Sequence, residues 1–133
     1  PGEAAALEED WSRVSRVDDY EAWADRPGGR LFTVRLGGRP VGVGAAARPG
    51  RPGRWVLEHL GTDPGLVDAL AAETVRVALA TLAPAATVHL PAPHHAVRFL
   101  LAAGWRVTTY DLFMATDADL LDPERVVPSP ALA

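Results

Sequence analysis

The pattern of hydrophobic and polar positions predicts a run of β-strands in the first half of the chain. After an irregular N-terminal part, short apolar-rich stretches are separated by glycine- and proline-rich turns. We expect three strands, at Leu31–Leu36, Arg39–Ala47 and Arg54–Gly61. Gly37-Gly38 is a two-residue hairpin signal, and Arg48–Gly53 is a second reversal. The three strands therefore form an antiparallel meander.

Two short helices are expected before the meander. The stretch Ala4–Asp10 has the composition of a helix. Val17–Ala24 has a stronger signal, because Asp18 and Glu21 have the spacing of a capping box. The residues that then share one face of this helix are Tyr20, Trp23 and Ala24.

Helices and strands alternate after the meander. Asp63-Pro64 is a helix start signal, and we expect the amphipathic stretch Gly65–Leu82 to bury Leu70 against the sheet. The further elements are a central strand at Thr87–Leu90, a helix at His94–Ala103 and a strand at Trp105–Thr116. A strand–helix–strand connection joins parallel strands. The predicted fold class is therefore α/β, with a mixed, mostly antiparallel sheet, a parallel central pair and flanking helices.

The chain is expected to form one domain with three parts. Its 133 residues suffice for one hydrophobic core. The parts are an N-terminal helical segment at residues 1–30, an α/β core at 31–116 and an extended tail at 117–133. Because the chain begins at Pro1 and its only methionine is Met114, we expect it to be either a processed chain or a fragment of a longer protein, and we favour the fragment.

Composition excludes several kinds of chemistry. The chain has no cysteine, which excludes disulfides, thiolate zinc sites and cysteine nucleophiles. It also has no Lys, Asn, Gln or Ile, a bias typical of GC-rich genomes such as those of actinobacteria. The net charge of −4 gives no support for nucleic-acid binding. No apolar run has the length of a bilayer span, so we expect no membrane association and a cytoplasmic location.

Three local sequences, in this order of elements, resemble the GNAT superfamily of N-acetyltransferases over about Leu31–Thr116. RPVGVGAA resembles the third strand of the family, and WVLEHLGTDP resembles its fourth strand and the approach to the cofactor loop. HAVRFLLAAGW resembles a later family segment through Ala96, Gly104 and Trp105. The resemblance implies a V-shaped sheet that binds acetyl-CoA and transfers its acetyl group to a small-molecule amine. It further implies that the cofactor lies beside a set of four residues, Leu60, Gly61, Thr62 and Gly65.

The chain departs from the family pattern at the cofactor. The glycine-rich loop that offers backbone N–H groups to the pyrophosphate is shortened, and only Gly65 remains of it. Leu100 stands at the position of the general-acid Tyr, and Pro93 at that of an Asn that contacts the pantetheine arm. One final strand is predicted where the family has two. The open sheet edge that this leaves is expected to be covered by a partner domain or by a second copy in a homodimer.

Three residues are candidates for proton transfer. Glu58 and His59 are neighbours in a predicted strand, so they should face opposite sides of the sheet. Either residue could take the proton from an attacking ammonium, as a general base must. Tyr110, in the last predicted strand, could replace the missing general acid. The alternative for all three is a structural hydrogen bond or a place at the edge of the core.

Two further motifs are expected to carry no chemistry. His89, His94 and His95 lie close together, but their spacing fits no known zinc geometry, so we expect no metal site and a buried, hydrogen-bonded His89. The arginines of Arg48–Arg54 could contact a DNA minor groove or CoA phosphates, but an exposed connection between strands accounts for them best.

Three functions remain open at this point. The first is an acetyl-CoA-dependent N-acyltransferase acting on a small amine. The second is a catalytically eroded GNAT-like domain that supports a neighbouring catalytic domain. The third is a small-ligand binding module that uses the same cleft without acyl transfer, because a fold alone does not determine function.

Overall fold

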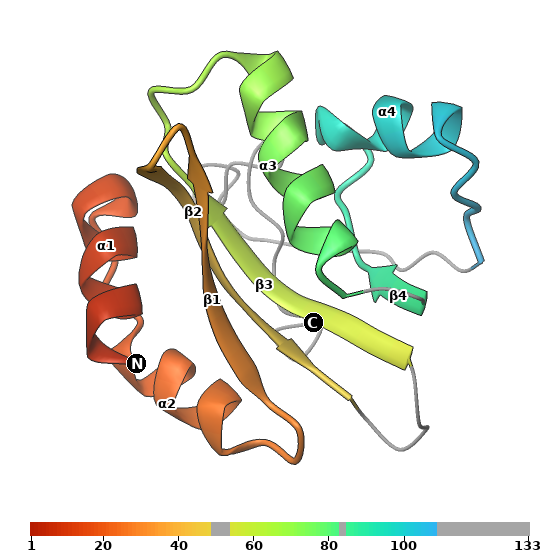
Figure 1. Ribbon diagram of the computed structural model, residues 1–133. Coiled ribbons are helices and arrows are strands. Elements are labelled where there is room, and N and C mark those ends of the chain that lie inside the picture. Colours follow the sequence, from red (N-terminus) through yellow and green to blue (C-terminus); the bar gives the residue numbers. More distant parts are fainter. Residues whose placement is uncertain (49–53, 83–84, 109–133) are drawn as a thin grey trace, which may run out of the picture.

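The protein forms a four-stranded sheet between two pairs of helices, as the computed structural model in Figure 1 shows. The structure describes residues 1–48, 54–82 and 85–108. Its elements are α1 (Gly2–Ser12), α2 (Val17–Asp25), β1 (Arg30–Leu36), β2 (Arg39–Ala47), β3 (Arg54–Thr62), α3 (Asp68–Ala80), β4 (Ala85–Val88) and α4 (Ala96–Ala102). The predicted α/β class is confirmed.

The strands follow the order β1-β2-β3-β4. The first two pairings are antiparallel, whereas β3 and β4 are parallel. Gly37 and Gly38 both have positive φ angles, 57° and 84°, which the tight turn between β1 and β2 requires and which glycine adopts without strain. The meander and the parallel pair are thus confirmed.

The strand β4 lies at the edge of the described sheet, although we predicted a central strand there. The strand predicted at Trp105–Thr116 is not formed over residues 105–108. The rest of that prediction, including Tyr110, lies outside the described residues, as does the tail predicted at 117–133.

Two hydrophobic cores lie on opposite faces of the sheet (Figure 1). The larger one lies between the sheet and the helices α3 and α4, and Leu57, Leu60 and Val75 are among its fully buried members. The smaller one lies beneath α1 and α2. Its buried residues are Ala5, Tyr20, Trp23, Val43 and Ala45. Of the three residues predicted to share a face of this helix, Tyr20 and Trp23 are buried and Ala24 is half-buried.

A β-bulge interrupts β3 at Glu58. Ala45 of β2 pairs with His59, whereas the next residue, Ala46, pairs with Leu57, so that Glu58 has no partner in the register. A bulge breaks the alternation of side chains that a regular strand imposes. The prediction that Glu58 and His59 face opposite sides of the sheet depended on that alternation, and it is wrong.

Contacts on either side of the bulge show where the two side chains point. Glu58 forms an ion pair with Arg26, directly after α2, and His59 contacts Glu8 on α1. Both acid–base candidates therefore reach the helix pair α1–α2. Leu57 and Leu60, on either side of them, belong to the core beneath α3.

The helix α3 begins later than Asp63-Pro64 predicts. Asp63 instead closes a turn, since its Oδ1 accepts a hydrogen bond from the Gly65 N–H at 2.8 Å, and its other oxygen pairs with Arg39. The residue before the first turn of α3 is Val67. Leu70 is 44% exposed, so the prediction that it is buried is wrong. The residues that α3 buries are Ala71, Ala72, Thr74, Val75, Ala78 and Leu79.

Candidate functional site

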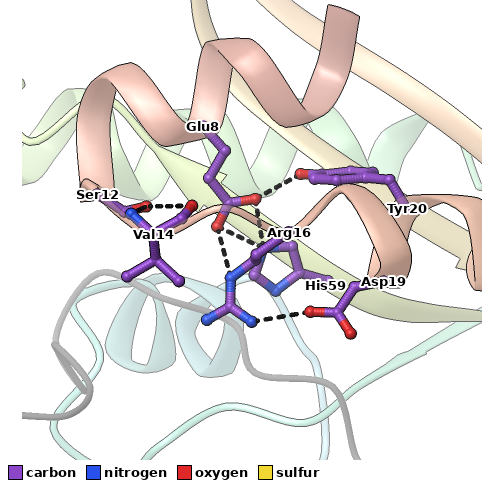
Figure 2. Close-up of polar contacts among 7 residues, drawn as sticks. All are labelled: Glu8, Ser12, Val14, Arg16, Asp19, Tyr20 and His59. Atoms are coloured by element: carbon purple, nitrogen blue, oxygen red, sulfur yellow. Dashed lines mark hydrogen bonds and ion pairs between the residues drawn. The ribbon is translucent and has the colours of Figure 1, made fainter. Parts of the chain in front are cut away.

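A buried carboxylate, Glu8, is the centre of a polar cluster between α1, α2 and β3 (Figure 2). The Tyr20 hydroxyl donates a hydrogen bond to Glu8 Oε2 at 2.6 Å. His59 Nε2 lies 2.9 and 3.0 Å from the two carboxylate oxygens. The Arg16 Nε atom is 3.3 Å from Oε1, and the same guanidinium contacts Asp19 at 3.2 Å. We call Glu8, Arg16, Asp19, Tyr20 and His59 the Glu8 cluster.

Close packing holds this cluster together. His59, 1% exposed, stacks on the Trp23 indole with ring centroids 4.9 Å apart and an interplanar angle of 15°. A side chain at Gly61 would place its Cβ 3.0 Å from the Glu8 carboxyl carbon, so the absence of one lets the carboxylate approach β3. The three elements are therefore fixed to one another through a single carboxylate.

The partners of Glu8 keep it ionised. Burial raises the pKa of the Glu8 carboxyl, but this is outweighed by the hydrogen bond and charge of His59, the hydrogen bond from Tyr20 and the charge of Arg16, so that its pKa is below the usual 4.5. Burial and the neighbouring Glu8 charge raise the pKa of Tyr20, which stays a neutral donor. An ionised carboxylate only accepts hydrogen bonds, so His59 Nε2 carries the hydrogen atom of the hydrogen bond between His59 and Glu8.

This electrostatic arrangement predicts an acid-sensitive fold. A carboxyl whose pKa is lower in the folded state contributes stability that is present above its unfolded pKa and is lost as the pH falls through its folded pKa. For Glu8 the loss begins below pH 4.5. We expect Glu8→Gln to lose less of its remaining stability than the wild type does when urea denaturation is followed from neutral pH to about pH 3.

Glu9→Gln is the matched control for this acid titration, because Glu9 is exposed on the same helix and has no ion pair among the described residues. Its acid dependence should follow the wild type. Parallel acid dependence in Glu8→Gln and the wild type would contradict the assignment of the effect to Glu8.

Glu58 and His59, two of the three predicted acid–base residues, lie on the same side of the sheet, but each already contacts another side chain of the protein. Glu58 is only 5% exposed, and its Oε2 lies 3.0 Å from the Arg26 guanidinium. His59 shares its Nε2 hydrogen with Glu8. Both residues therefore lie beneath α1 and α2, and both side chains make contacts within the protein.

The four residues predicted to border a cofactor do not share one surface. Leu60 is fully buried in the core beneath α3, whereas Gly61 lies against Glu8 on the opposite face. Thr62 is buried at the end of β3. The Gly65 N–H donates to Asp63, so this backbone donor already has an acceptor within the protein.

The entrance to α3 is acidic. Asp63 precedes it, and Asp68 stands in its first turn. The Asp68 carboxylate lies 3.3 Å from His95 Nε2, just before α4. Carboxylates near a helix N-terminus interact favourably with the helix dipole, and they repel a further anion at the same place. Asp68 therefore already occupies the position at this end of α3 that favours an anion.

The strands β3 and β4 are paired over only part of β3. The pairing joins Arg54–Leu57 to Ala85–Val88, and β3 then continues to Thr62. Because β4 ends at Val88, the second half of β3 has no β4 partner along that edge. The strand β3 therefore extends beyond its parallel partner.

The three clustered histidines have separate environments. The Nδ1 atom of buried His94 accepts a hydrogen bond from the Ala96 N–H at 3.0 Å, and His95 lies beside Asp68. His89 is half-buried just after β4, not fully buried as we expected. Within residues 1–48, 54–82 and 85–108, no group of three or more His, Cys, Asp or Glu side chains is arranged to hold a metal ion.

None of the helices described in these ranges has the length and apolarity needed to cross a membrane.

Sequence reasoning missed the centre of the cluster. Glu8 lies in a run of acidic residues with Glu9 and Asp10, and no local pattern distinguishes it from them. Its burial is seen only in the structure, where Ala5, three residues earlier on the same face of α1, is also fully buried. Comparison with family models, with curated proteins and with solved structures finds no match for this chain.

Proposed function

We propose that this chain is a GNAT-like domain that has no acyl-transfer centre of its own and supports a neighbouring catalytic domain. The observation that carries the proposal is that Glu58 and His59 are both bound to other residues of the protein. Both candidate bases lie on β3, and internal partners on or next to α1 and α2 already occupy them.

A general base must present a proton-accepting atom to the substrate. The Nε2 of His59 already carries a hydrogen, which it donates to Glu8, and the Trp23 indole covers one face of the imidazole ring. Glu58 could accept a proton only after its ion pair with Arg26 is broken and the buried carboxylate becomes accessible. Both residues therefore have a structural role in the contact between α1, α2 and β3, and neither presents a free proton-accepting atom to a substrate.

The cofactor side supports the same proposal. A phosphate cradle at a helix N-terminus needs backbone N–H groups without other acceptors. Here the Gly65 N–H is held by Asp63, and the Asp68 carboxylate already stands in the first turn of α3. Large apolar side chains on the α3–α4 side are exposed, among them Leu70, Phe99 and Leu101. Exposed apolar side chains of this size suit a domain that packs against a neighbour.

A second candidate is an acetyl-CoA-dependent N-acyltransferase that acts on a small amine. The length of β3 beyond its pairing with β4 favours it. An extended ligand that contains amide groups, such as a pantetheine arm, can add to the edge of a strand through main-chain hydrogen bonds. This candidate requires Glu58 or His59 to be released from its internal contacts.

Titration with acetyl-CoA separates the two candidates. A ligand that binds only the folded state raises the melting temperature. For a non-catalytic domain we expect no saturable shift at micromolar acetyl-CoA, and no release of free CoA in the presence of a panel of small amines. A saturable shift together with CoA release would overturn the proposal.

The variant Glu58→Gln then tests the role of the carboxylate. If the chain does release CoA, loss of a general base should lower turnover by about a hundredfold or more. The matched control is Glu73→Gln, which removes an exposed carboxylate that is also paired with an arginine. Equal turnover in Glu58→Gln and Glu73→Gln would show that Glu58 is not the general base.

A further inference from the structure

Two arginines converge on a single tryptophan at one end of the sheet. The Arg30 guanidinium carbon lies 4.8 Å from the centroid of the Trp55 ring, and that of Arg48 lies 4.2 Å from it. Arg30 begins β1, Arg48 follows β2, and Trp55 is the second residue of β3. Arg30, Arg48 and Trp55 therefore form one cationic cluster, which we call the Trp55 cluster.

The backbone fixes this arrangement. Arg30 is opposite Ala46 in the β1–β2 register, and Arg48 lies two residues further along the chain, so the two arginines share a face of the sheet. Trp55 is 3% exposed and belongs to the core beneath α3, so it provides a rigid base. The turn before β1 packs against the first carbon of the Arg48 side chain. A Cβ atom at Gly28 would lie 3.5 Å from the Cβ of Arg48.

The charges in the Trp55 cluster are not neutralised within the described part of the chain. There, Arg16, Arg26, Arg39 and Arg76 each pair with a carboxylate. No carboxylate of the described residues forms an ion pair with Arg30 or Arg48, and both side chains are exposed. Two cations that approach one ring repel each other, and an anion placed between them removes that repulsion.

We propose that the Trp55 cluster binds the phosphate group of a small phosphorylated molecule between Arg30 and Arg48. A phosphate monoester carries close to two negative charges, which matches two guanidinium groups, whereas a carboxylate carries one. The planar fork of N–H donors on arginine fits two phosphate oxygens at once. The site lies at the end of β2 and the start of β3, on the face of the sheet that α3 covers, and it does not depend on the proposed function.

Nuclear magnetic resonance tests the proposal on the whole chain. The Nε–Hε signals of Arg30 and Arg48 are assigned from their absence in Arg30→Ala and Arg48→Ala. Inorganic phosphate and glycerol 3-phosphate are titrated separately at constant ionic strength, because exposed charges are screened by salt. We expect both arginine signals and the Trp55 indole signal to move saturably with either probe.

The two probes identify the source of the phosphate. Tighter binding of glycerol 3-phosphate identifies an ester as the ligand, and equal affinities identify the free anion. Each single arginine variant should weaken binding by about tenfold or more, since a hydrogen bond to a charged group contributes on the order of 1.5–3 kcal/mol. The matched control is Arg76→Ala, which removes the same charge from an exposed site on α3.

Two results would overturn the proposal. One is the absence of saturable movement at millimolar concentrations of both probes, with the thermal melt showing a folded protein. The other is a loss of affinity in Arg76→Ala as large as that in Arg48→Ala, because the binding would then follow net charge and not the Trp55 cluster.

Discussion

Glu8→Ala is expected to lower the free energy of unfolding by about 3–5 kcal/mol, the cost of removing one partner from a buried ion pair. The substitution leaves the Tyr20 hydroxyl and the His59 N–H without their acceptor, in a place that water does not reach. It also leaves the Arg16 guanidinium without the carboxylate beside its Nε. An unsatisfied buried donor costs more than the net value of the hydrogen bond that it made.

Urea denaturation at neutral pH measures this loss, and Glu9→Ala is the control. Glu9 has the same chemistry on the same helix but is exposed, so its replacement should change stability by no more than about 0.5 kcal/mol. Equal losses in the two variants would mean that Glu8 is not the residue that joins α1 to β3. If Glu8→Ala does not fold, Glu8→Gln retains the shape of the side chain and allows the same comparison.

Leu79→Ala should cost about 2–5 kcal/mol, the range for deletion of a large core side chain. Leu79 is 4% exposed on α3 and packs in the larger core. Leu70→Ala, on the same helix, should cost less than about 1 kcal/mol, because a side chain that is 44% exposed loses little buried area.

Chemical denaturation of the two leucine variants tests which face of α3 meets the sheet. They are matched, because each deletes the same atoms from one helix. A larger loss in Leu70→Ala than in Leu79→Ala would show that α3 is rotated about its axis and would restore the face that the sequence pattern indicates.

The two mistakes about helix and strand faces have a common physical cause. At α3, Asp63 and Pro64 are local start signals, but Asp63 forms its own turn with Gly65 and pairs with Arg39 from β2. At β3, the residues along the strand give no sign of the bulge at Glu58, which appears only in the pairing with β2. Local signals identify an element, but its neighbours set its exact start and the direction of its side chains.

The sequence by itself determined what depends on neighbouring residues along the chain. Gly37-Gly38 specified the first hairpin because glycine adopts positive φ without strain, and the glycine- and proline-rich turns between three strands specified the meander. The strand–helix–strand order specified the parallel pair, and the spacing of Tyr20 and Trp23 specified the helix face that the structure buries. Tertiary structure alone decided the Glu8 cluster, since Glu8 and His59 are 51 residues apart and meet only when α1 packs on β3. It also decided that Arg30 and Arg48 converge on Trp55, because three separate strands must come into register before these side chains can meet.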